Sequence, residues 1–380
     1  MLNLRLAVSL LVLLSATASA QSSRGVSSRE RVTRPAPPLA CCSTAAPLTA
    51  SPSLGPSAPT GAPWTLADLR TLIPLPGDGN WSALAPMTRD LGEVSAALID
   101  NRVYVVGRGH PQTLRYDPST NTWIESLTWR PFRGHHHAVE VFDGKMYLIG
   151  GRQTNSEGKV QIYNPVTNGW SLGADLPWSG GSVSTALIDG KIYAAGGIVD
   201  NLFTTDRCAV YDPLLDTWTE LAPMPAGRNH TAAATDGERF WIFGGRGPGS
   251  GDTDVVANGY DDVQVYDPVT NSWQTSASSG SRLRPLPQFR GGLGKAIYRQ
   301  GEFWVMGGET LSGPGATPLK VYGHVDVYDP ELGIWRSAAP MLTPRHGIHP
   351  VRMNDDSILV PGGGTQAGGS QSTVVERWTP

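Results

Sequence analysis

Arginine and histidine recur at matching positions along this chain, and arginine is well suited to hold an anion. Five arginines precede an apolar run, and three arginines and a glutamate follow one or two glycines. They are Arg89, Arg133, Arg228, Arg290 and Arg345 in the first set, and Arg108, Arg152, Arg246 and Glu309 in the second. The guanidinium donates paired hydrogen bonds to carboxylates and phosphates. Six of the eight histidines lie in or beside the same segments, including His136, His230 and His349. The pattern predicts a site for an anionic group.

The run His135–His137 offers imidazole, a common protein ligand for zinc and copper. Alternate residues of a strand point to the same side, so two of these rings would face together. No carboxylate or cysteine at ligand spacing accompanies the run, and a site would have to include His230, His346 or His349 from distant segments. We therefore assign no metal and no cofactor.

Two further patterns bear on chemistry. The glycine-rich loop Gly247–Asp254 has acidic side chains at alternate positions and is followed by Asp261-Asp262, as in calcium loops, but the closing glutamate of an EF-hand is missing. We interpret this segment as a solvated hairpin extension. The sequence has no nucleophile elbow, phosphate-binding loop or paired-carboxylate motif, so no catalytic residue is assigned.

A repeated unit must position these side chains, because one series of landmarks recurs along the chain. An alternating apolar run ends in a turn pair, as in Ala186–Gly190, and a short apolar strand then ends in two glycines, as in Lys191–Gly197. After a variable loop, a strand ends in aromatic-Asp-Pro, as in Ala209–Pro213, and Trp218 follows seven residues after the aromatic. Strand, turn, strand, loop, strand, turn and strand make one four-stranded antiparallel sheet.

The landmarks indicate six units. Aromatic strand ends fall at residues 116, 163, 211, 266 and 328, and the fourth-strand tryptophans are Trp81, Trp123, Trp170, Trp218, Trp273 and Trp335. The last unit stops at Trp378 without a fourth strand, whereas Asn80–Leu84 is a fourth strand that precedes the first complete unit. We therefore expect each terminus to complete the sheet of the other, which removes two exposed edges and closes a ring.

Each landmark has a physical reason. Asp-Gly at 143, 189 and 236 suits a two-residue hairpin turn with positive φ. Paired glycines let neighbouring sheets approach where a β-carbon would clash. The Tyr and Trp of each unit provide large areas for burial between sheets, worth about 1.5 to 3 kcal/mol for each fully buried large side chain. We interpret these aromatic residues as core.

The double glycine with its spaced tyrosine and tryptophan resembles the kelch repeat, over Trp81 to Trp378. The resemblance implies an all-β fold of the galactose oxidase/kelch superfamily: a six-bladed kelch-type β-propeller with four-stranded antiparallel blades, the last closed by the N-terminal strand. In such propellers the loops before the first strand and after the second open on one face of the central channel. The arginines and histidines named above are then expected to converge on one mouth. The structural alternative is that an arginine before a first strand pairs with an acid or with carbonyls of the neighbouring blade.

Fold alone does not fix function, because kelch propellers serve as adaptors, actin binders and enzymes. We favour a non-enzymatic module that binds another protein or an anionic glycan. The alternative is a sugar epimerase, since the chain is similar in architecture to periplasmic sialic acid mutarotases, and Glu309 beside Arg246 or Arg345 would act as general acid or base. A copper-radical oxidase resembling galactose oxidase is disfavoured. The sequence reads Gly347-Ile348-His349 where that family has a Tyr-His pair, and Cys208 lies at a repeat strand.

The N-terminal part of the chain has targeting and linker signals. Arg5, the apolar run Leu6–Leu14 and a small-residue stretch predict a secretory signal at 1–20 with cleavage after Ala20, and hence a secreted or periplasmic protein. The apolar run is far shorter than the ~20 residues of a membrane span, and no integral membrane segment is expected. Residues 21–63, with eight prolines, are predicted to be a disordered spacer, followed by a lead-in at 64–79 and the propeller at 80–380.

Composition narrows the class of protein and of partner. Three cysteines, Cys41, Cys42 and Cys208, cannot form a disulfide framework for a domain of about 300 residues, so packing must hold the core. Lipidation or disulfide bonding of the first two stays open. Residues 80–380 have 24 basic and 30 acidic side chains, once the six arginines and three acids of 1–79 are subtracted from the chain's 30 and 33. This mild acidity argues against nucleic acid as the partner. We expect a monomer.

Overall fold

The computed structural model describes residues 79–200, 203–248, 259–310 and 320–380. The predicted signal, the spacer, Cys41, Cys42 and the lead-in up to residue 78 lie outside these ranges, as does most of the acidic loop Gly247–Asp254. Every element of regular secondary structure in the described part is a β-strand, as expected for an all-β protein. In that part, no helix is long and apolar enough to cross a bilayer.

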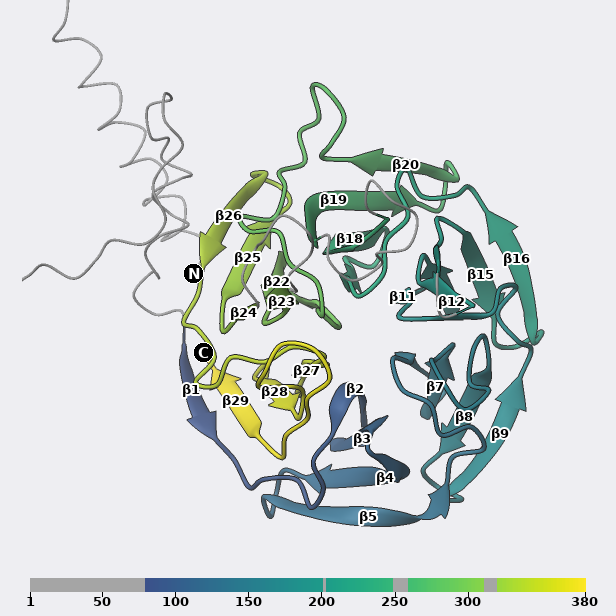
Figure 1. Ribbon diagram of the computed structural model, residues 1–380, viewed down its shortest axis with the longest axis vertical. Coiled ribbons are helices and arrows are strands. Elements are labelled where there is room, and N and C mark those ends of the chain that lie inside the picture. Colours follow the sequence, from purple (N-terminus) through teal and green to yellow (C-terminus); the bar gives the residue numbers. More distant parts are fainter. Residues whose placement is uncertain (1–78, 201–202, 249–258, 311–319) are drawn as a thin grey trace, which may run out of the picture. The chain divides into compact units, whose positions relative to one another are not determined.

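Six four-stranded antiparallel sheets stand around a common axis in the described residues (Figure 1). Blade 1 holds β2 (Gly92–Ile99), β3 (Arg102–Arg108), β4 (His110–Asp117) and β5 (Thr122–Trp129); blade 2 holds β6 (Ala138–Phe142), β7 (Lys145–Ile149), β8 (Val160–Asn164) and β9 (Gly169–Gly173); blade 3 holds β11 (Ser184–Ile188), β12 (Lys191–Ala195), β15 (Cys208–Asp212) and β16 (Thr217–Leu221). Blade 4 holds β17 (Ala232–Thr235), β18 (Phe240–Arg246), β19 (Gly259–Asp267) and β20 (Ser272–Thr275); blade 5 holds β21 (Ile297–Arg299), β22 (Glu302–Met306), β25 (Val325–Asp329) and β26 (Ile334–Ser337); blade 6 holds β27 (Val351–Arg352), β28 (Ile358–Pro361), β29 (Val375–Thr379) and β1 (Asn80–Ala83). Short ladders join β10 (Gly180–Gly181), β13 (Ile198–Val199) and β14 (Phe203–Thr204), and join β23 (Glu309–Thr310) to β24 (Lys320–Val321).

The predicted closure of the ring by both chain ends is confirmed. The strand β1 pairs antiparallel with β29, with Trp81 opposite Trp378, and the two lie side by side in Figure 1. The Trp81 indole N–H donates to the carbonyl of Ala339 at 2.8 Å. The sixth sheet is therefore built from segments nearly three hundred residues apart.

The predicted aromatic core is also confirmed. The tyrosines that end the third strands of blades 1 to 5 are at most 3% exposed. Each packs on the tryptophan of the next strand, with ring centroids 4.8 to 5.1 Å apart. The tryptophan also reaches the preceding blade: Trp218 Nε1 donates to Ala174 O at 2.9 Å. The aromatic pairs thus fill the space between blades and join them by hydrogen bonds.

The double glycines set the spacing of the blades. A β-carbon on Gly196 would lie 2.3 Å from the carbonyl oxygen of Arg228 in the next blade. The N–H of Gly197 donates to that same oxygen at 2.8 Å. Gly307 has the same relation to Arg345, with the β-carbon at 2.5 Å. Because no β-carbon fits, the glycine pair allows the backbones of adjacent blades to hydrogen-bond directly.

The predicted two-residue turn is confirmed at two of the three Asp-Gly pairs, and the prediction is wrong at the third. Asp143-Gly144 has φ values of 50° and 65°, and Asp189-Gly190 has 49° and 74°, as a two-residue turn of this kind requires. At Asp236, residues 236–239 separate β17 from β18. The Asp236 carboxylate accepts the backbone N–H groups of residues 238 and 239 at 2.9 and 2.7 Å, which stabilises a wider turn.

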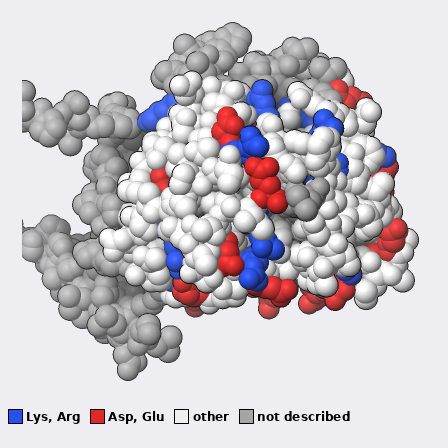
Figure 2. Space-filling view, turned by 90° about the horizontal axis from the view of Figure 1, so that it is seen from below, with Lys and Arg blue, Asp and Glu red and all other residues white. Residues whose placement is uncertain are grey.

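Charges of both signs are interspersed on the face seen in Figure 2. Lys and Arg lie next to Asp and Glu there, and no band of one sign crosses this view. This face therefore offers no basic stripe of the kind that nucleic acid requires.

Candidate functional site

Equivalent residues just before the first strand of each blade, or at its start in blade 1, surround the propeller axis, and we call them the axial ring. They are Glu93, His136, Ser182, His230, Gly292 and Gly347, and all have φ between 44° and 61°. Their backbones bond from blade to blade: Ser182 N donates to His136 O at 2.9 Å, and Gly347 N to Gly292 O at 2.7 Å. The left-handed conformation is costly for any residue but glycine. Four blades nevertheless place a side chain there.

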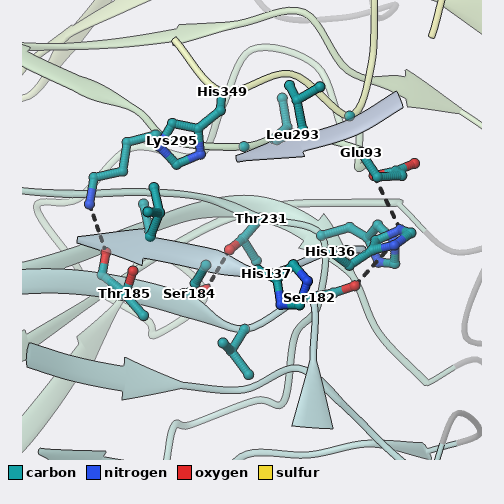
Figure 3. Close-up of a pocket in the computed structure, with 18 of the residues that line it drawn as sticks. Glu93, His136, His137, Ser182, Ser184, Thr185, Thr231, Leu293, Lys295 and His349 are labelled. Atoms are coloured by element: carbon teal, nitrogen blue, oxygen red, sulfur yellow. Dashed lines mark hydrogen bonds and ion pairs between the residues drawn. The ribbon is translucent and has the colours of Figure 1, made fainter. Parts of the chain in front are cut away.

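Three side chains of the axial ring meet at the axis. Figure 3 shows Glu93 directed at His136, whose Nε2 lies 3.1 Å from Glu93 Oε2. The rings of His136 and His230 are edge-to-face with centroids 4.8 Å apart. One oxygen or nitrogen from each of Glu93, His136 and His230 lies within 4.8 Å of the other two. Glycine in blade 6 makes room, because a β-carbon on Gly347 would lie 2.8 Å from Glu93 Cδ.

Burial controls the protonation of this cluster. It lowers the pKa values of His136 and His230 well below the ordinary 6.5, and Arg152 and Arg246 lower them further. Burial also raises the pKa of Glu93, an effect opposed first by His346 and then by Arg246. Both imidazoles are therefore neutral near pH 7 and keep a lone pair for a proton donor or a metal ion.

A second layer surrounds the axial ring. His346 is 1% exposed, and its Nε2 lies 3.7 Å from Glu93 Oε1 and 3.7 Å from Glu309 Oε2. The Glu309 carboxylate contacts the Arg246 guanidinium and accepts the Gly368 N–H at 2.7 Å. The predicted proximity of Glu309 and Arg246 is thus found, and both side chains are buried.

Three of the predicted ligand-binding arginines occupy a different place from the one expected. Each is buried and paired with an acid on the third strand of its own blade: Arg228 with Asp262 at 2.8 Å, Arg290 with Asp326 at 2.5 Å and Arg345 with Glu376 at 3.1 Å. These three arginines therefore have the structural role that we gave as the alternative to ligand binding. Their acidic partner, however, lies in the same blade and not in the neighbouring one. Their carbonyls accept the glycine N–H of the preceding blade, so they hold the ring together.

A small cavity lies beneath the axial ring. Its volume is about 60 Å³, and Lys295, Thr185 and His349 line its far end (Figure 3). Lys295 of blade 5 pairs with Glu140 of blade 2 and donates to Thr185 O at 3.5 Å, so an ion pair crosses the channel. Burial lowers the pKa of His349 to about 3. The cavity has room for a few water molecules. It is far below the roughly 300–1,000 Å³ of small-molecule sites.

The exposed arginines share a shallow cleft between blades 1 and 2. Arg108 and Arg133 line it together with Gly109–Pro111 and Gln153-Thr154, and we call it the arginine cleft. Arg108 has no hydrogen-bond or ion-pair partner among the described residues, and Arg133 lies over the Trp129 ring, 4.7 Å from its centroid. Trp129 is 55% exposed. Two cations therefore line the cleft, and an exposed aromatic ring packs against one of them.

The other predicted arginines contribute less to this surface. Arg89 is exposed but bonds to Glu125 Oε1 at 2.9 Å. Arg152 is half-buried, and its backbone pairs with that of His135. Of the eight arginines predicted to share one mouth, four are thus in buried ion pairs, two line the arginine cleft, and Arg89 and Arg152 belong to neither group.

Sequence reasoning missed Glu93, Lys295 and Trp129 as members of the site. The signal for Glu93 was present, because aligning the blades at their glycine pairs places Glu93 opposite His136 and His230. For Lys295 and Trp129 no motif marks the position. Both depend on contacts between blades.

Cys208 belongs to the core between blades 3 and 4. It is 2% exposed in a cluster with Phe240 and Tyr266, and burial raises its pKa to about 12. A thiol in this environment is inert. It gives no support to a copper-radical site.

A ring of four-stranded antiparallel sheets, completed by both termini and lined at its axis by equivalent loops, defines a β-propeller. The family model described as Kelch motif matches residues 133–177, 180–225 and 227–279, which correspond to blades 2, 3 and 4. The chain belongs to the kelch-repeat family. It is 30% identical to Kelch-like protein terF of Aspergillus terreus, over 81% of this chain and 69% of that protein.

Other relatives agree on the fold. The chain is 27% identical to Kelch-like protein 23 of Homo sapiens over 79% of its own length, and spans 50% of that protein. The solved structure of YjhT superposes with a TM-score of 0.64 at 19% identity, covering 77% of this chain and 96% of that one. This likeness shows a shared fold.

Proposed function

We propose that this protein is an exported binding module whose arginine cleft holds an acidic segment of another protein. The observation that carries the proposal is that Arg108 and Arg133 are exposed, share one cleft and have no carboxylate partner among the described residues. Unpaired guanidinium groups on one surface favour carboxylates, with which they form charge-assisted hydrogen bonds.

The composition of the cleft favours a protein partner over a glycan. Trp and Arg are the residues most enriched among those that dominate protein–protein binding energy. The ring of Trp129 supports the guanidinium of Arg133, so less side-chain freedom is lost when a partner binds. An anionic glycan would use the same two cations and is the other outcome of the test.

A display selection with random peptides, run beside a glycan array, tests the proposal. We expect the wild-type protein to enrich peptides rich in Asp and Glu, and the double variant Arg108→Gln/Arg133→Gln to lose that enrichment. Capture of acidic glycans alone would assign the cleft to sugars. Equal enrichment by both proteins would show that the arginine cleft is not the binding site.

We infer export from the N-terminal pattern of charge, apolar run and small residues. When the full chain is expressed in a bacterium with a secretory pathway, we expect the mature protein in the periplasm or medium, beginning at Gln21. N-terminal sequencing checks this. An intact Met1 on the soluble protein would contradict it.

A sugar epimerase is the second candidate, and one observation favours it: the predicted neighbours Glu309 and Arg246 are in contact. Two features count against it. The Glu309 carboxylate already bonds to Arg246 and to the Gly368 N–H, and the cavity beneath the axial ring, about 60 Å³ in volume, is small for a sugar and is lined by neither residue. Faster exchange between the anomers of sialic acid, measured by NMR with the purified protein, would support this candidate.

A further inference from the structure

The axial ring gathers a donor set typical of a bound transition metal. We propose that Glu93, His136 and His230 bind one divalent first-row ion, with zinc as the best match, and that the ion's open side faces the cavity beneath the ring. Two imidazole nitrogens and one carboxylate oxygen with an open position are a known set for zinc. None of its three ligands lines the arginine cleft, and the site does not depend on the proposed binding function.

The distances are close to those that an ion needs. The candidate donor atoms of the three side chains all lie within 4.8 Å of one another. Two ligands on one zinc ion, each at 2.0–2.1 Å, are at most about 4.2 Å apart. Side-chain movements of less than about 1 Å would therefore complete the coordination.

The orientation of His230 fits metal binding. Its Nδ1–H donates to Asn229 Oδ1 at 2.5 Å, which leaves Nε2 as the acceptor, with the Ser182 hydroxyl oxygen 3.4 Å away. Asn229 is held in turn, because its Nδ2 donates to Thr204 Oγ1 at 2.7 Å. A metal-binding histidine usually donates its second ring N–H to an oxygen in this way, which fixes the tautomer.

The backbone supplies an independent observation. Glu93, His136 and His230 all have φ between 44° and 60°, where blades 5 and 6 have glycine. The inter-blade hydrogen bonds of the ring explain the conformation but do not require a side chain, since Gly292 and Gly347 make them too. Residues that keep such strain cluster at functional sites, where the side chain is needed.

The second layer adds a buried atom that lacks a partner. His346 is 1% exposed, and its Nε2 makes no hydrogen bond to any described residue. It points into the cluster, 3.7 Å from Glu93 Oε1. Buried polar atoms almost always bond to protein, water or an ion. An unpartnered buried nitrogen beside Glu93 therefore fits a site that holds an ion or a water.

The local charges permit a cation. Arg152 and Arg246 act on both histidines of the cluster, and Arg246 and Arg108 act on Glu93. Glu309 pairs with Arg246, and Glu93 adds a second negative charge within the donor set. The two carboxylates offset part of the positive charge of these three arginines, and Glu93 as a ligand places a negative charge next to the ion.

Zinc titration of the full chain, after treatment with EDTA and dialysis, tests the site. We expect one zinc ion per chain by calorimetry. The melting temperature should rise by about 5 °C or more at a hundredfold excess over the dissociation constant, because the ion joins blades 1, 2 and 4. Cobalt(II) at the same site should give visible absorption bands of a four- or five-coordinate ion, which zinc abolishes.

Variants locate the ion. Glu93→Gln and His230→Gln should each weaken zinc binding at least tenfold, whereas His349→Gln, which changes a histidine at the far end of the same cavity, should leave it unchanged. Circular dichroism verifies folding of each variant. Wild-type protein that binds no zinc and gives no cobalt spectrum would overturn the proposal, as would equal binding by both ligand variants. The arginine cleft variant should bind zinc normally, so the two proposals fail separately.

Discussion

Replacing Arg345 with methionine should lower the free energy of unfolding by about 3–5 kcal/mol, because it leaves a buried carboxylate without its partner. Arg345 is 0% exposed and Glu376 is 1% exposed. The guanidinium also donates to Val360 O at 3.1 Å and to Gly362 O at 2.7 Å. These carbonyls lose their donor as well. Urea denaturation followed by tryptophan fluorescence measures the change.

An exposed arginine of the same blade is the matched control. Arg352 bonds to Asp356 at 2.8 Å, but its side chain is 46% exposed, so Arg352→Met should cost less than about 1 kcal/mol. The double variant Arg345→Met/Glu376→Leu should recover part of the loss, since both charges are then removed. If Arg345→Met were as stable as Arg352→Met, Arg345 would not be the structural residue described above.

Removing residues 1–84 should destabilise the propeller strongly, whereas removing residues 1–63 should not. The longer deletion removes β1, whose register with β29 pairs Asn80 with Thr379 and Trp81 with Trp378. The exposed edge of β29 would then be free to pair with other chains. We expect a melting temperature lower by about 10 °C or more, with aggregation, measured by calorimetry and light scattering.

The shorter deletion is the control, because it keeps β1 and removes only the predicted signal and spacer. Its melting temperature should match that of the mature protein. Two deletions of equal stability would mean that the ring does not need its closing strand.

The architecture was predictable from the sequence because its determinants are local and repeated. A tyrosine and a tryptophan mark blades 1 to 5, a glycine pair marks blades 2 to 6, and the tyrosine packs on the tryptophan in each of its copies. The ring closure was predicted by counting strands, because the first unit is preceded by an extra fourth strand and the last unit lacks one. The turn at Asp236 could not be read in this way, because its own carboxylate competes with the two-residue turn for backbone N–H groups.

The site was only partly predictable, because its members were identified by spacing and not by direction. The positions of Arg228 and Arg108 within their repeats predicted that both side chains lie near the channel. Only the fold shows that Arg228 turns inward to Asp262 while Arg108 stays exposed. Glu93 was overlooked because its importance comes from two histidines in other blades. Residues of different blades come together only when the ring closes, so the pattern within one repeat does not reveal them.

The central functional claim is that Arg108 and Arg133 together bind carboxylates. Fluorescence anisotropy of a fluorescein-labelled polyglutamate peptide tests it most directly, with wild-type protein, Arg108→Gln/Arg133→Gln, and the control Arg102→Gln/Arg239→Gln. The control removes the same charge from two exposed arginines near Asp117 and Asp267. We predict that the cleft variant binds at least about tenfold more weakly, while the control matches wild type. Equal affinity of all three proteins, or equal loss in both variants, would contradict the claim.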